Sequence, residues 1–283
     1  SPGGIGMSSM TTIIRLSLHE LRIRIRSQRM VILGPLLILF IPGSVWGFAD
    51  PNTTLPGQIA VDGAATVMFL SSLFVLLSAT LGVVLVGFDA ISRPRMTGEL
   101  AIDLAQPIDR RDLAMGHLFG VWGTVAIPVA ILQFLSLGLI YRQMDIVPEP
   151  LDAGIWIVST ALLLFWYASL QLIASSIAQD LGSSVTFGVA TWLFFTLLWL
   201  LVTVVIATLL GVDATDTSNI EFIRFQERAD LFSPNGIYQL LLQSRLPETA
   251  QPTVHPAFLV MSTIGWTFLP AGFYLRRFRQ LKP

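Results

Sequence analysis

The chain has 283 residues, of which 53% are hydrophobic and only 12% are charged, and its formal net charge at pH 7 is −1. Soluble domains carry roughly 25% charged residues, so this composition excludes an ordinary soluble globular protein. The absence of cysteine excludes disulfides, thiolate chemistry and cysteine-based metal sites.

Residues 1–6, ahead of Met7, are expected to be a cloning remnant, and the fold is expected to begin after them. Over residues 8–29, apolar and basic side chains recur in two separate stripes. The apolar stripe contains Ile14, Leu18, Leu21 and Ile25, and the basic stripe contains Arg15, Arg22, Arg26 and Arg29. This spacing predicts an amphipathic helix that lies in the membrane interface with its arginines at the headgroups. The alternative, that the arginines only set the topology of the first span, stays open.

Six runs of the chain contain no Asp, Glu, Lys, Arg or His. They cover residues 31–49, 63–88, 118–141, 153–177, 184–211 and 256–275. At about 1.5 Å per helical residue, runs of this length cross a hydrocarbon core of roughly 30 Å. The strands of a membrane barrel alternate polar and apolar residues, and these runs do not. The sequence therefore predicts an all-α polytopic membrane protein with six transmembrane helices, in a single transmembrane domain over residues 1–283.

The segment 89–117, which follows the second run, is the most organised polar part of the chain. Residues 97–106 are expected to form a short helix that presents Leu100 and Leu104 on one side and is stopped by Pro107. A connector that only turned the chain would not need a helix here. The pattern indicates a recognition surface.

The helix that becomes span three has its own signals near its start. Asp109 is expected to be its N-cap, with Asp112 at capping-box spacing. Gly116 and Gly120 form a Gly-x-x-x-Gly motif, which is typical of close helix packing.

Two glutamines are the most polar groups inside the runs. Gln133 and Gln171 are interpreted first as hydrogen-bonding groups between packed helices, and a place on a translocation path is the alternative. Ser78 and Gly82 repeat the spacing of small residues in span two and indicate close packing there.

The long segment 212–255 mixes acid-rich and apolar pieces. Ser233 and Pro234 predict the start of a short helix. Its apolar side would carry Tyr238, Leu241 and Leu242. We interpret the segment as a solvated or interfacial cap, and a binding site for an extracytoplasmic partner is the alternative.

Basic residues are concentrated on one side of the predicted spans. Thirteen of the seventeen Arg and Lys residues lie in the amino-terminal segment, in the loop after the second run, or in the carboxyl-terminal tail. The positive-inside rule then predicts a multi-pass protein of the cell membrane with both termini cytoplasmic.

The chain lacks residues that several classes of function require. The three histidines, His19, His117 and His255, fall at or outside the ends of the runs, which argues against hydrolysis inside the membrane. No run holds a charged group, which disfavours an ion-coupled carrier without excluding it. The only lysine is Lys282, so the chain has no phosphate-binding loop of an ATPase. If the protein pumps, a separate polypeptide supplies the energy.

The loop 89–117 resembles the segment between spans two and three of ABC-2 type permeases, in particular their NosY-like branch. The residues that carry the resemblance are Asp89, Ile91-Ser92, Arg95, Gly98-Glu99-Leu100, Leu104, Gln106-Pro107-Ile108, Arg110-Arg111, Leu113 and Gly116. Two positions depart from the family pattern, with Pro94 where Glu is frequent and His117 where Lys is frequent. Residues 231–235 are also similar to an outer element of this branch.

The resemblance implies an ABC-2, type V exporter-like transmembrane domain that works with a second permease copy and two copies of a separate ATPase. ATP and Mg²⁺ would bind to that ATPase, and this chain would hold no cofactor, metal or catalytic residue. The loop would carry the coupling helix, with Leu100 and Leu104 as apolar anchors in the ATPase cleft. The coupling residues carried over in this way are Arg93, Arg95, Thr97, Gly98, Glu99, Leu100, Leu104, Pro107, Arg110 and Arg111. The four arginines would meet acidic groups at the rim of that cleft.

The implied function is that of a permease subunit that couples ATP hydrolysis to export or to mechanical signalling. The expected partners are the ATPase, a second permease and the lipid bilayer, and no nucleic acid. A stand-alone channel or secondary carrier and a membrane scaffold for an outer-face partner stay open as alternatives.

Overall fold

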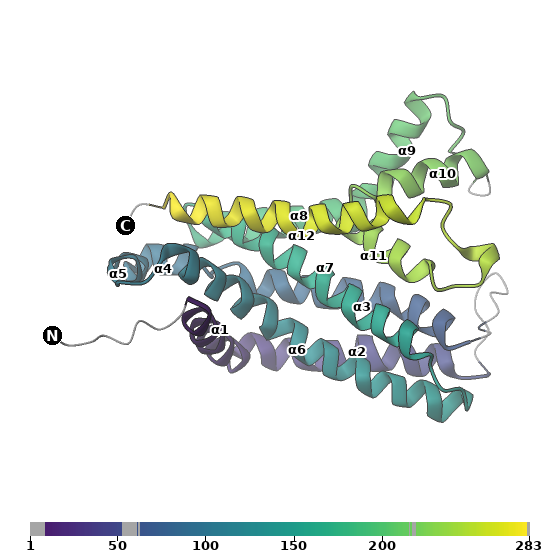
Figure 1. Cartoon of the computed structure of the whole chain (residues 1–283), viewed down its shortest axis with the longest axis horizontal. Helices are drawn as coiled ribbons and strands as arrows, with labels where there is room; N and C mark the ends of the chain where they lie inside the picture. The colour runs from purple at the N-terminus through teal and green to yellow at the C-terminus, as the bar shows by residue number, and fades with distance from the viewer. Residues whose placement is uncertain (1–8, 53–60, 62, 215, 217–218, 282–283) are drawn as a thin grey trace.

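The computed structural model of the protein describes residues 9–52, 61, 63–214, 216 and 219–281, and every regular element in these ranges is helical (Figure 1). The elements are α1 (Ser9–Ile25), α2 (Gln28–Ala49), α3 (Ala64–Gly87), α4 (Ser92–Thr97), α5 (Glu99–Ala105), α6 (Arg110–Met144), α7 (Pro150–Ile177), α8 (Leu181–Leu193), η1 (Phe194–Leu198), α9 (Trp199–Leu209), α10 (Ile220–Asp230), α11 (Pro234–Gln243), η2 (Glu248–Ala250) and α12 (Pro256–Arg279). The predicted all-α class is confirmed. The segment expected to be a cloning remnant, residues 1–6, lies outside the described residues.

Six helical stretches in the described residues are long and apolar enough to cross a membrane, as the six uncharged runs predicted. They are Gln28–Ala49, Ala64–Thr97, Arg110–Met144, Pro150–Ile177, Leu181–Leu209 and Pro256–Arg279. In Figure 1 they form an elongated bundle with α4, α5 and the end of α12 at one end, here called the α5 end. The other end, here called the α10 end, carries α9, α10 and α11. The chain is thus a multi-pass membrane protein.

Helix α1 is held against α6 by glycines. A Cβ atom at Gly116 would lie 2.6 Å from the Cβ atom of Leu16, and one at Gly123 would lie 3.0 Å from the side chain of Leu21. Gly120, between them, faces the side chain of Glu20 just as closely. Because these positions lack side chains, α1 lies almost directly on the backbone of α6. The Gly-x-x-x-Gly motif is therefore a close-packing motif, as predicted, and the helix that it receives is α1.

The helix predicted over residues 8–29 ends earlier than expected. It stops at Ile25, and α2 begins at Gln28 after a short break. Its outer face is apolar as predicted, with Ile14 and Leu18 exposed. A helix that buries one face on α6 and exposes another apolar face fits a position at the surface of a bilayer.

Small residues also set the contact between spans one and two. A Cβ atom at Gly82 of α3 would lie 2.9 Å from the side chain of Leu33 in α2. The hydroxyl of Ser78, one turn earlier, donates to the carbonyl of Phe74 in its own helix, 2.7 Å away. The small-residue spacing predicted for span two is therefore a packing surface.

The segment 212–255 contributes a helix to the core, which the interpretation as a solvated cap did not anticipate. Helix α11 starts where predicted, with Ser233 as N-cap, and its Ile237, Tyr238 and Leu242 are buried. It packs on α7, α3 and α12. Only α10 has the exposed polar face that an interfacial cap would show, because its apolar residues gather on one side.

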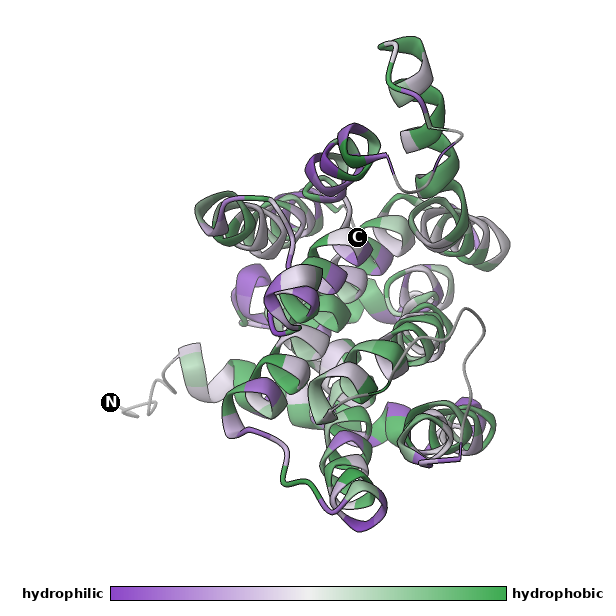
Figure 2. Cartoon of the chain, turned by 90° about the vertical axis from the view of Figure 1, so that its right-hand side faces the viewer, coloured by the Kyte–Doolittle hydropathy of each residue, from purple (hydrophilic) through white to green (hydrophobic). Residues whose placement is uncertain are grey.

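Span five is the least buried of the six spans. Its half nearer the α5 end is α8 and its half nearer the α10 end is α9, and α9 extends away from the other helices at the α10 end (Figures 1 and 2). Figure 2 shows α9 coloured as hydrophobic along most of its length. Leu200 and Leu209 are exposed on it, and only Thr203 and Ala207 are buried. This surface needs lipid or another protein to cover it.

We expect Gly120→Leu to release α1 from α6, because the new side chain would overlap Glu20 and overpacking costs about 1–3 kcal/mol. The midpoint of thermal unfolding should fall, and trypsin should cut faster at the arginines of α1. Gly138→Leu is the matched control, since nothing lies within 4 Å of a Cβ atom at that position of the same helix. Wild-type stability and cleavage in G120L would show that the glycine groove does not hold α1.

Candidate functional site

The carboxylate of Asp89, directly after α3, is the centre of an ion-pair cluster at the α5 end. Arg29 of α2 donates two hydrogen bonds to it, of 2.9 and 2.7 Å. Arg93 of α4 lies 3.2 Å from it and Arg24 of α1 lies 3.6 Å from it. The side chain of Asp89 is only 9% exposed. One acidic group therefore joins α1, α2, α4 and the end of α3.

The same arginines also reach the carbonyl end of α3. Arg24 donates to the carbonyl of Val86 at 2.9 Å, and Arg29 to that of Leu85 at 3.3 Å. The guanidinium of Arg29 lies over the ring of Phe88, 4.4 Å from its centre. Positive charge at a helix C-terminus is favourable because the last carbonyls carry partial negative charge. Arg29 was predicted to lie at the lipid headgroups, and this prediction is wrong, since its side chain is turned into the protein.

Glu20 links α1 to α6 through a second, smaller group of charges. Arg24 Nη2 lies 2.9 Å from Glu20 Oε2, and His117 Nδ1 lies 3.1 Å from Glu20 Oε1, with the ring not aligned for a straight hydrogen bond. Burial by itself would raise the pKa of the Glu20 carboxyl, but His117 and Arg24 outweigh it and lower that pKa to about 2. His117 also packs on Phe278 of α12, with 5.9 Å between the ring centres. The amino-terminal helix is thereby tied to spans three and six.

The helix predicted over residues 97–106 corresponds to α5, and a second short helix, α4, precedes it in the same loop. Gly98 has a φ of 81°, a left-handed conformation that favours glycine, and it separates α4 from α5. The helix expected over residues 97–106 therefore starts two residues later, at Glu99, and ends at Ala105, ahead of the exposed Pro107. Asp109 caps α6 as predicted, by accepting a hydrogen bond from the amide of Arg111. Asp112 does not close a capping box but accepts from Ser9 of α1.

The two leucines of α5 face the chain itself. Leu100 is 2% exposed and belongs to the hydrophobic core, and Leu104 packs against that core. The prediction that Leu100 is an apolar anchor for a partner is therefore corrected, because its side chain is already covered. The exposed apolar residues of this hairpin are Met96, at 56%, and Ile102, at 66%. Thr97, Gly98 and Glu99 are also exposed at its tip.

Two of the predicted rim arginines bind the ends of spans instead. Arg95 donates to the carbonyls of Ser176 and Ala178 at the end of α7, at 2.8 and 2.9 Å. Arg110 donates to the carbonyls of Arg279 and Leu281 at the end of α12, both at 3.0 Å. Carbonyls at helix ends have no partner inside the helix, so each arginine satisfies two of them.

The expectation that all four arginines meet a partner's acidic groups is therefore corrected as well. Arg93 pairs with Asp89, and Arg95 and Arg110 hold span ends of this chain. Arg111 is exposed and has no ion pair among the described residues. It is the one arginine of the four that is wholly available to another molecule.

A set of serines, which the sequence reasoning missed, fixes the start of α4. The amides of Ile91 and Ser92 both donate to Ser175 Oγ of α7, at 3.1 Å each. Ser175 Oγ in turn donates to the carbonyl of Phe88 at 2.9 Å, and the hydroxyl of Ser184 in α8 donates to the same carbonyl. Serine is frequent in membrane helices, so its spacing alone gave no signal. The ion-pair cluster, in contrast, did leave a signal in the sequence. Asp89 is an acidic residue directly after span two, and arginines precede span one.

Gln133 and Gln171 are both almost fully buried, at 1% and 2% exposure. Gln133 donates to Thr160 Oγ1 of α7 at 2.9 Å, and Thr160 shares a hydrogen bond of 3.1 Å with the hydroxyl of Tyr238 in α11. Gln171 lies between Gly87 of α3 and Gly188 of α8, where any larger residue would meet its side chain. Its carboxamide has no hydrogen-bond partner among the described residues. The predicted hydrogen bond between packed helices is thus present for Gln133, whereas Gln171 is packed between helices without one.

Asn235 connects α11 to spans four and five. Its Oδ1 accepts from the hydroxyl of Tyr167 at 2.8 Å, and its Nδ2 donates to the carbonyl of Phe195 at 3.1 Å and to Thr196 Oγ1 at 3.3 Å. Phe195 and Thr196 belong to the π-helical turn η1, where the regular helical bonding of span five is interrupted. The segment 231–235, singled out from the sequence, thus holds the irregular point of a span.

A buried carboxyl holds the corner between α10 and α11. Asp230 Oδ1 accepts a hydrogen bond of 3.0 Å from the indole of Trp199. Burial raises the pKa of Asp230 to about 6, and the charge of Glu227 adds to that rise, while the bond from Trp199 opposes it. The corner is tight, since a Cβ atom at Gly236 would lie 2.5 Å from the carbonyl oxygen of Asp230.

No group of three or more His, Asp or Glu that could hold a metal ion is found among the described residues. The structure therefore offers two connected polar regions. One is the ion-pair cluster around Asp89 with the α4–α5 hairpin, and the other is the Asn235 network at the α10 end.

We expect Asp89→Asn to destabilise the protein by about 3 kcal/mol, because three arginines would lose their shared counter-charge in a largely buried place. Thermal unfolding in detergent measures the loss. Asp103→Asn is the control, since this carboxylate on α5 has only a 3.5 Å contact with Gln106. Equal unfolding temperatures for D89N and D103N would contradict a structural role for the cluster.

The raised pKa of Asp230 predicts that the corner is more stable near pH 5 than near pH 7.5. Between the ordinary pKa of 3.8 and the folded value of about 6, the folded protein binds more protons than the unfolded one, so stability falls as the pH rises through this window. The difference in unfolding temperature between the two pH values should shrink in Asp230→Asn. An unchanged difference would show that Asp230 does not titrate in this range.

One comparison with known proteins bears on these regions. Residues 14–282 match the family described as ABC-2 family transporter protein. A search of curated proteins found no match. The family match covers nearly the whole chain, including α1 from Ile14 on, the ion-pair cluster, the α4–α5 hairpin and all six spans. The chain therefore belongs to the ABC-2 family of transporter proteins.

Proposed function

We propose that this chain is the membrane-spanning permease subunit of an ATP-binding-cassette transporter and that a separate ATPase drives it. The observation that carries the proposal is the way the α4–α5 hairpin is fastened. Arg95 binds the end of α7, Arg110 binds the end of α12, and Arg93 joins the Asp89 cluster with α1 and α2. The hairpin's own arginines thus reach the ends of spans one, two and four, and Arg110, the first residue of α6, joins the start of span three to the end of span six.

The surface that an ATPase would contact is the tip of this hairpin. Met96 and Ile102 are exposed apolar residues there, and Thr97, Gly98 and Glu99 lie between them. Arg111 is exposed at the start of α6 nearby. Exposed apolar residues that belong to a rigidly anchored element suit a docking surface better than a free loop does. Leu100 and Leu104 hold the tip in place by packing in and against the hydrophobic core.

ATP and Mg²⁺ would belong to the partner, in two copies of the ATPase. The chain has a single lysine, Lys282, and no phosphate-binding loop before a helix. The chain is then a non-catalytic subunit that receives the motion produced by nucleotide binding and hydrolysis elsewhere.

A second copy of the permease is the partner proposed within the membrane. Span five exposes an apolar surface along α9, and its Leu200 and Leu209 have few neighbours in the chain. A dimer that covers span five would place two Asp89 clusters and two hairpins at the same end, one for each ATPase. We assign the chain to the NosY-like branch on the pattern of residues 89–116.

The proposed orientation puts the α5 end in the cytoplasm, with both termini. Arginines of α1, α4, α6 and α12 gather at this end, and the positive-inside rule favours the cytoplasm for them. The α10 end, with segment 212–255, would face the outside and be available to an extracytoplasmic partner. Nothing in the charge pattern, with a net charge of −1, suggests a nucleic acid.

Both export of a cargo and mechanical signalling are compatible with this arrangement. Among the described residues, Gln133 is paired and Gln171 is packed, so neither of these two glutamines opens a polar path through one chain. A cargo would therefore pass between two permeases or along their lipid-facing surfaces. A stand-alone channel or carrier is the alternative. In such a protein the anchored α4–α5 hairpin would have no function.

We expect the double substitution Met96→Asp, Ile102→Asp to abolish co-purification with a co-expressed ABC ATPase while leaving the unfolding temperature unchanged, because both side chains are exposed. Val147→Asp, which adds a carboxylate at an equally exposed position near the α10 end, should leave co-purification intact. A double variant that still binds the ATPase and still stimulates its hydrolysis in proteoliposomes would overturn docking at the hairpin tip. Binding of no ABC ATPase by the wild-type chain would favour the stand-alone alternative.

A further inference from the structure

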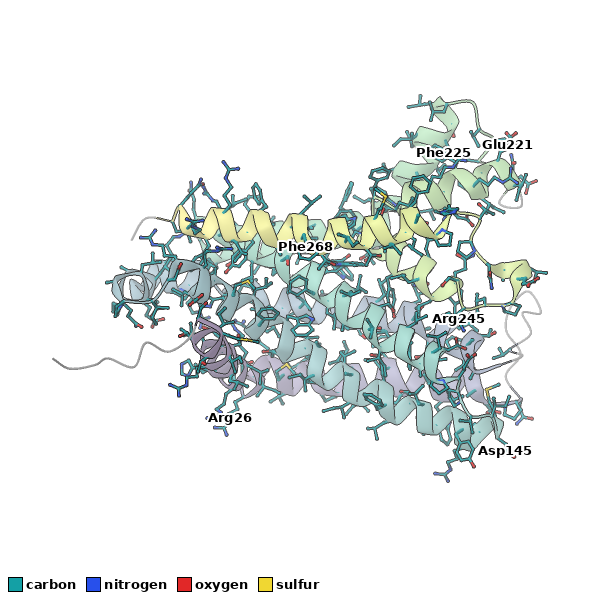
Figure 3. All side chains as sticks on the ribbon, viewed as in Figure 1. Arg26, Asp145, Glu221, Phe225, Arg245 and Phe268 are labelled. Carbon is teal, nitrogen blue, oxygen red and sulfur yellow. The ribbon has the colours of Figure 1, made fainter. Side chains whose placement is uncertain are left out.

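A cavity of about 660 Å³ opens at the α10 end, between α10 and the start of α12. Arg224 and Arg228 line it from α10, and Thr253, His255 and Phe258 line it from the approach to α12 and its first turn. Figure 3 shows α10, with Glu221 and Phe225 labelled, beside the outer end of α12. The proposed coupling role makes no use of this cavity.

The charge of the cavity is positive and is not balanced from within. Arg224 and Arg228 are exposed, one helical turn apart, and neither has an ion pair among the described residues. Glu227, between them in sequence, is buried and does not line the cavity; its carboxylate accepts from the amide and the hydroxyl of Thr253 and makes no ion pair with either arginine. His255 accepts from the amide of Ala257 through Nδ1, which leaves Nε2 as its outward nitrogen. The start of α12 adds the positive end of a long helix.

An apolar groove lies beside this cavity along α12. It has a volume of about 310 Å³ and is lined by Gly265, Trp266, Leu269 and Pro270. Leu231 and Phe232 line both the cavity and the groove, so the two lie side by side. Gly265 forms the floor of the groove, because no side chain fills the space above it and the nearest atom to a Cβ there is 3.9 Å away.

The dimensions of the two parts match one leaflet of a bilayer. From Phe258 to Pro270 the helix rises about 18 Å at 1.5 Å per residue, and half of a hydrocarbon core is about 15 Å. The arginines lie on α10, beside the start of α12, which is one end of a membrane span. Phe232 and Phe258 are exposed beside them, as aromatic residues at a membrane interface commonly are.

We propose that the cavity and groove form a binding site for an anionic glycerophospholipid. Arg224, Arg228 and His255 bind its phosphate and anionic headgroup, and an acyl chain lies in the groove over Gly265. A soluble anion would use the arginines but not the groove, and an apolar protein surface would use the groove but leave two unpaired arginines in the contact. Only a molecule with one anionic end and one long apolar chain uses both. The site is independent of the ATPase and of the hairpin.

The test is native mass spectrometry of the full-length protein from detergent, titrated with phosphatidylglycerol or with phosphatidylcholine of the same chains. Arg224→Gln, Arg228→Gln should weaken binding of phosphatidylglycerol at least about ten-fold and change that of phosphatidylcholine little, since each arginine near an anionic lipid contributes about 1 kcal/mol. Arg142→Gln is the charge control, because it is also exposed near the α10 end but lies outside the cavity.

The groove is tested with its own matched pair of variants. Gly265→Leu fills the acyl groove and should weaken binding of both lipids, whereas Gly272→Leu, on the same helix with open space around it, should not. Unfolding temperatures of all variants should match that of the wild type, since each site faces open space or solvent.

Three results would overturn the proposal. If glycerol 3-phosphate competes with phosphatidylglycerol and G265L binds it normally, the site takes a soluble anion. If R224Q/R228Q and G265L bind phosphatidylglycerol like the wild type, lipid does not occupy the site. If these substitutions instead change the mass of the oligomer with lipid binding unchanged, a second copy of the chain covers this face.

Discussion

The position of Asp89 constrains the whole α5 end of the molecule. A carboxylate that is 9% exposed at the edge of a membrane must be paired, and three arginines from three elements pair with it. Each of these elements is thereby fixed relative to α3. Because α1 is also packed into the glycines of α6 and tied to His117 by Glu20, the amino-terminal helix is an integral part of the bundle end.

The two ends of the bundle are built on the same plan. At the α5 end, Arg95 of α4 and Arg110, the first residue of α6, bind carbonyls at the ends of α7 and α12. At the α10 end, Asn235 of α11 binds a carbonyl within span five, and Tyr238 joins Thr160 and Gln133 in spans four and three. The spans themselves are held together mostly by apolar contacts and small residues. Polar specificity comes from the connecting segments, which are also where partners and lipids would act.

The six spans, the amphipathic start and the N-caps at Asp109 and Ser233 followed from the sequence, because each rests on local periodicity or on a single polar residue beside a helix. The orientation of Leu100 could not follow in the same way. A short helix with one apolar side looks the same whether that side faces a partner or its own bundle, and only the packing on the core decides. Arg29, Arg95 and Arg110 posed the same difficulty, since their acceptors include carbonyls far away in the chain. The burial of α11 was hidden by the acidic residues around it.

The π-helical turn in span five has a geometric consequence for everything after it. One additional residue within a helical turn rotates the following helix by about 100° about its axis, so α9 is set by an offset that regular winding from α8 would not give. Asn235 contacts the turn that produces this offset, because its Nδ2 donates to the carbonyl of Phe195. A shift of the extra residue along the span would rotate the residues that it passes, and the first of these would include the turn that Asn235 contacts. The position of the π-helical turn and the seating of α11 are therefore linked through one hydrogen bond.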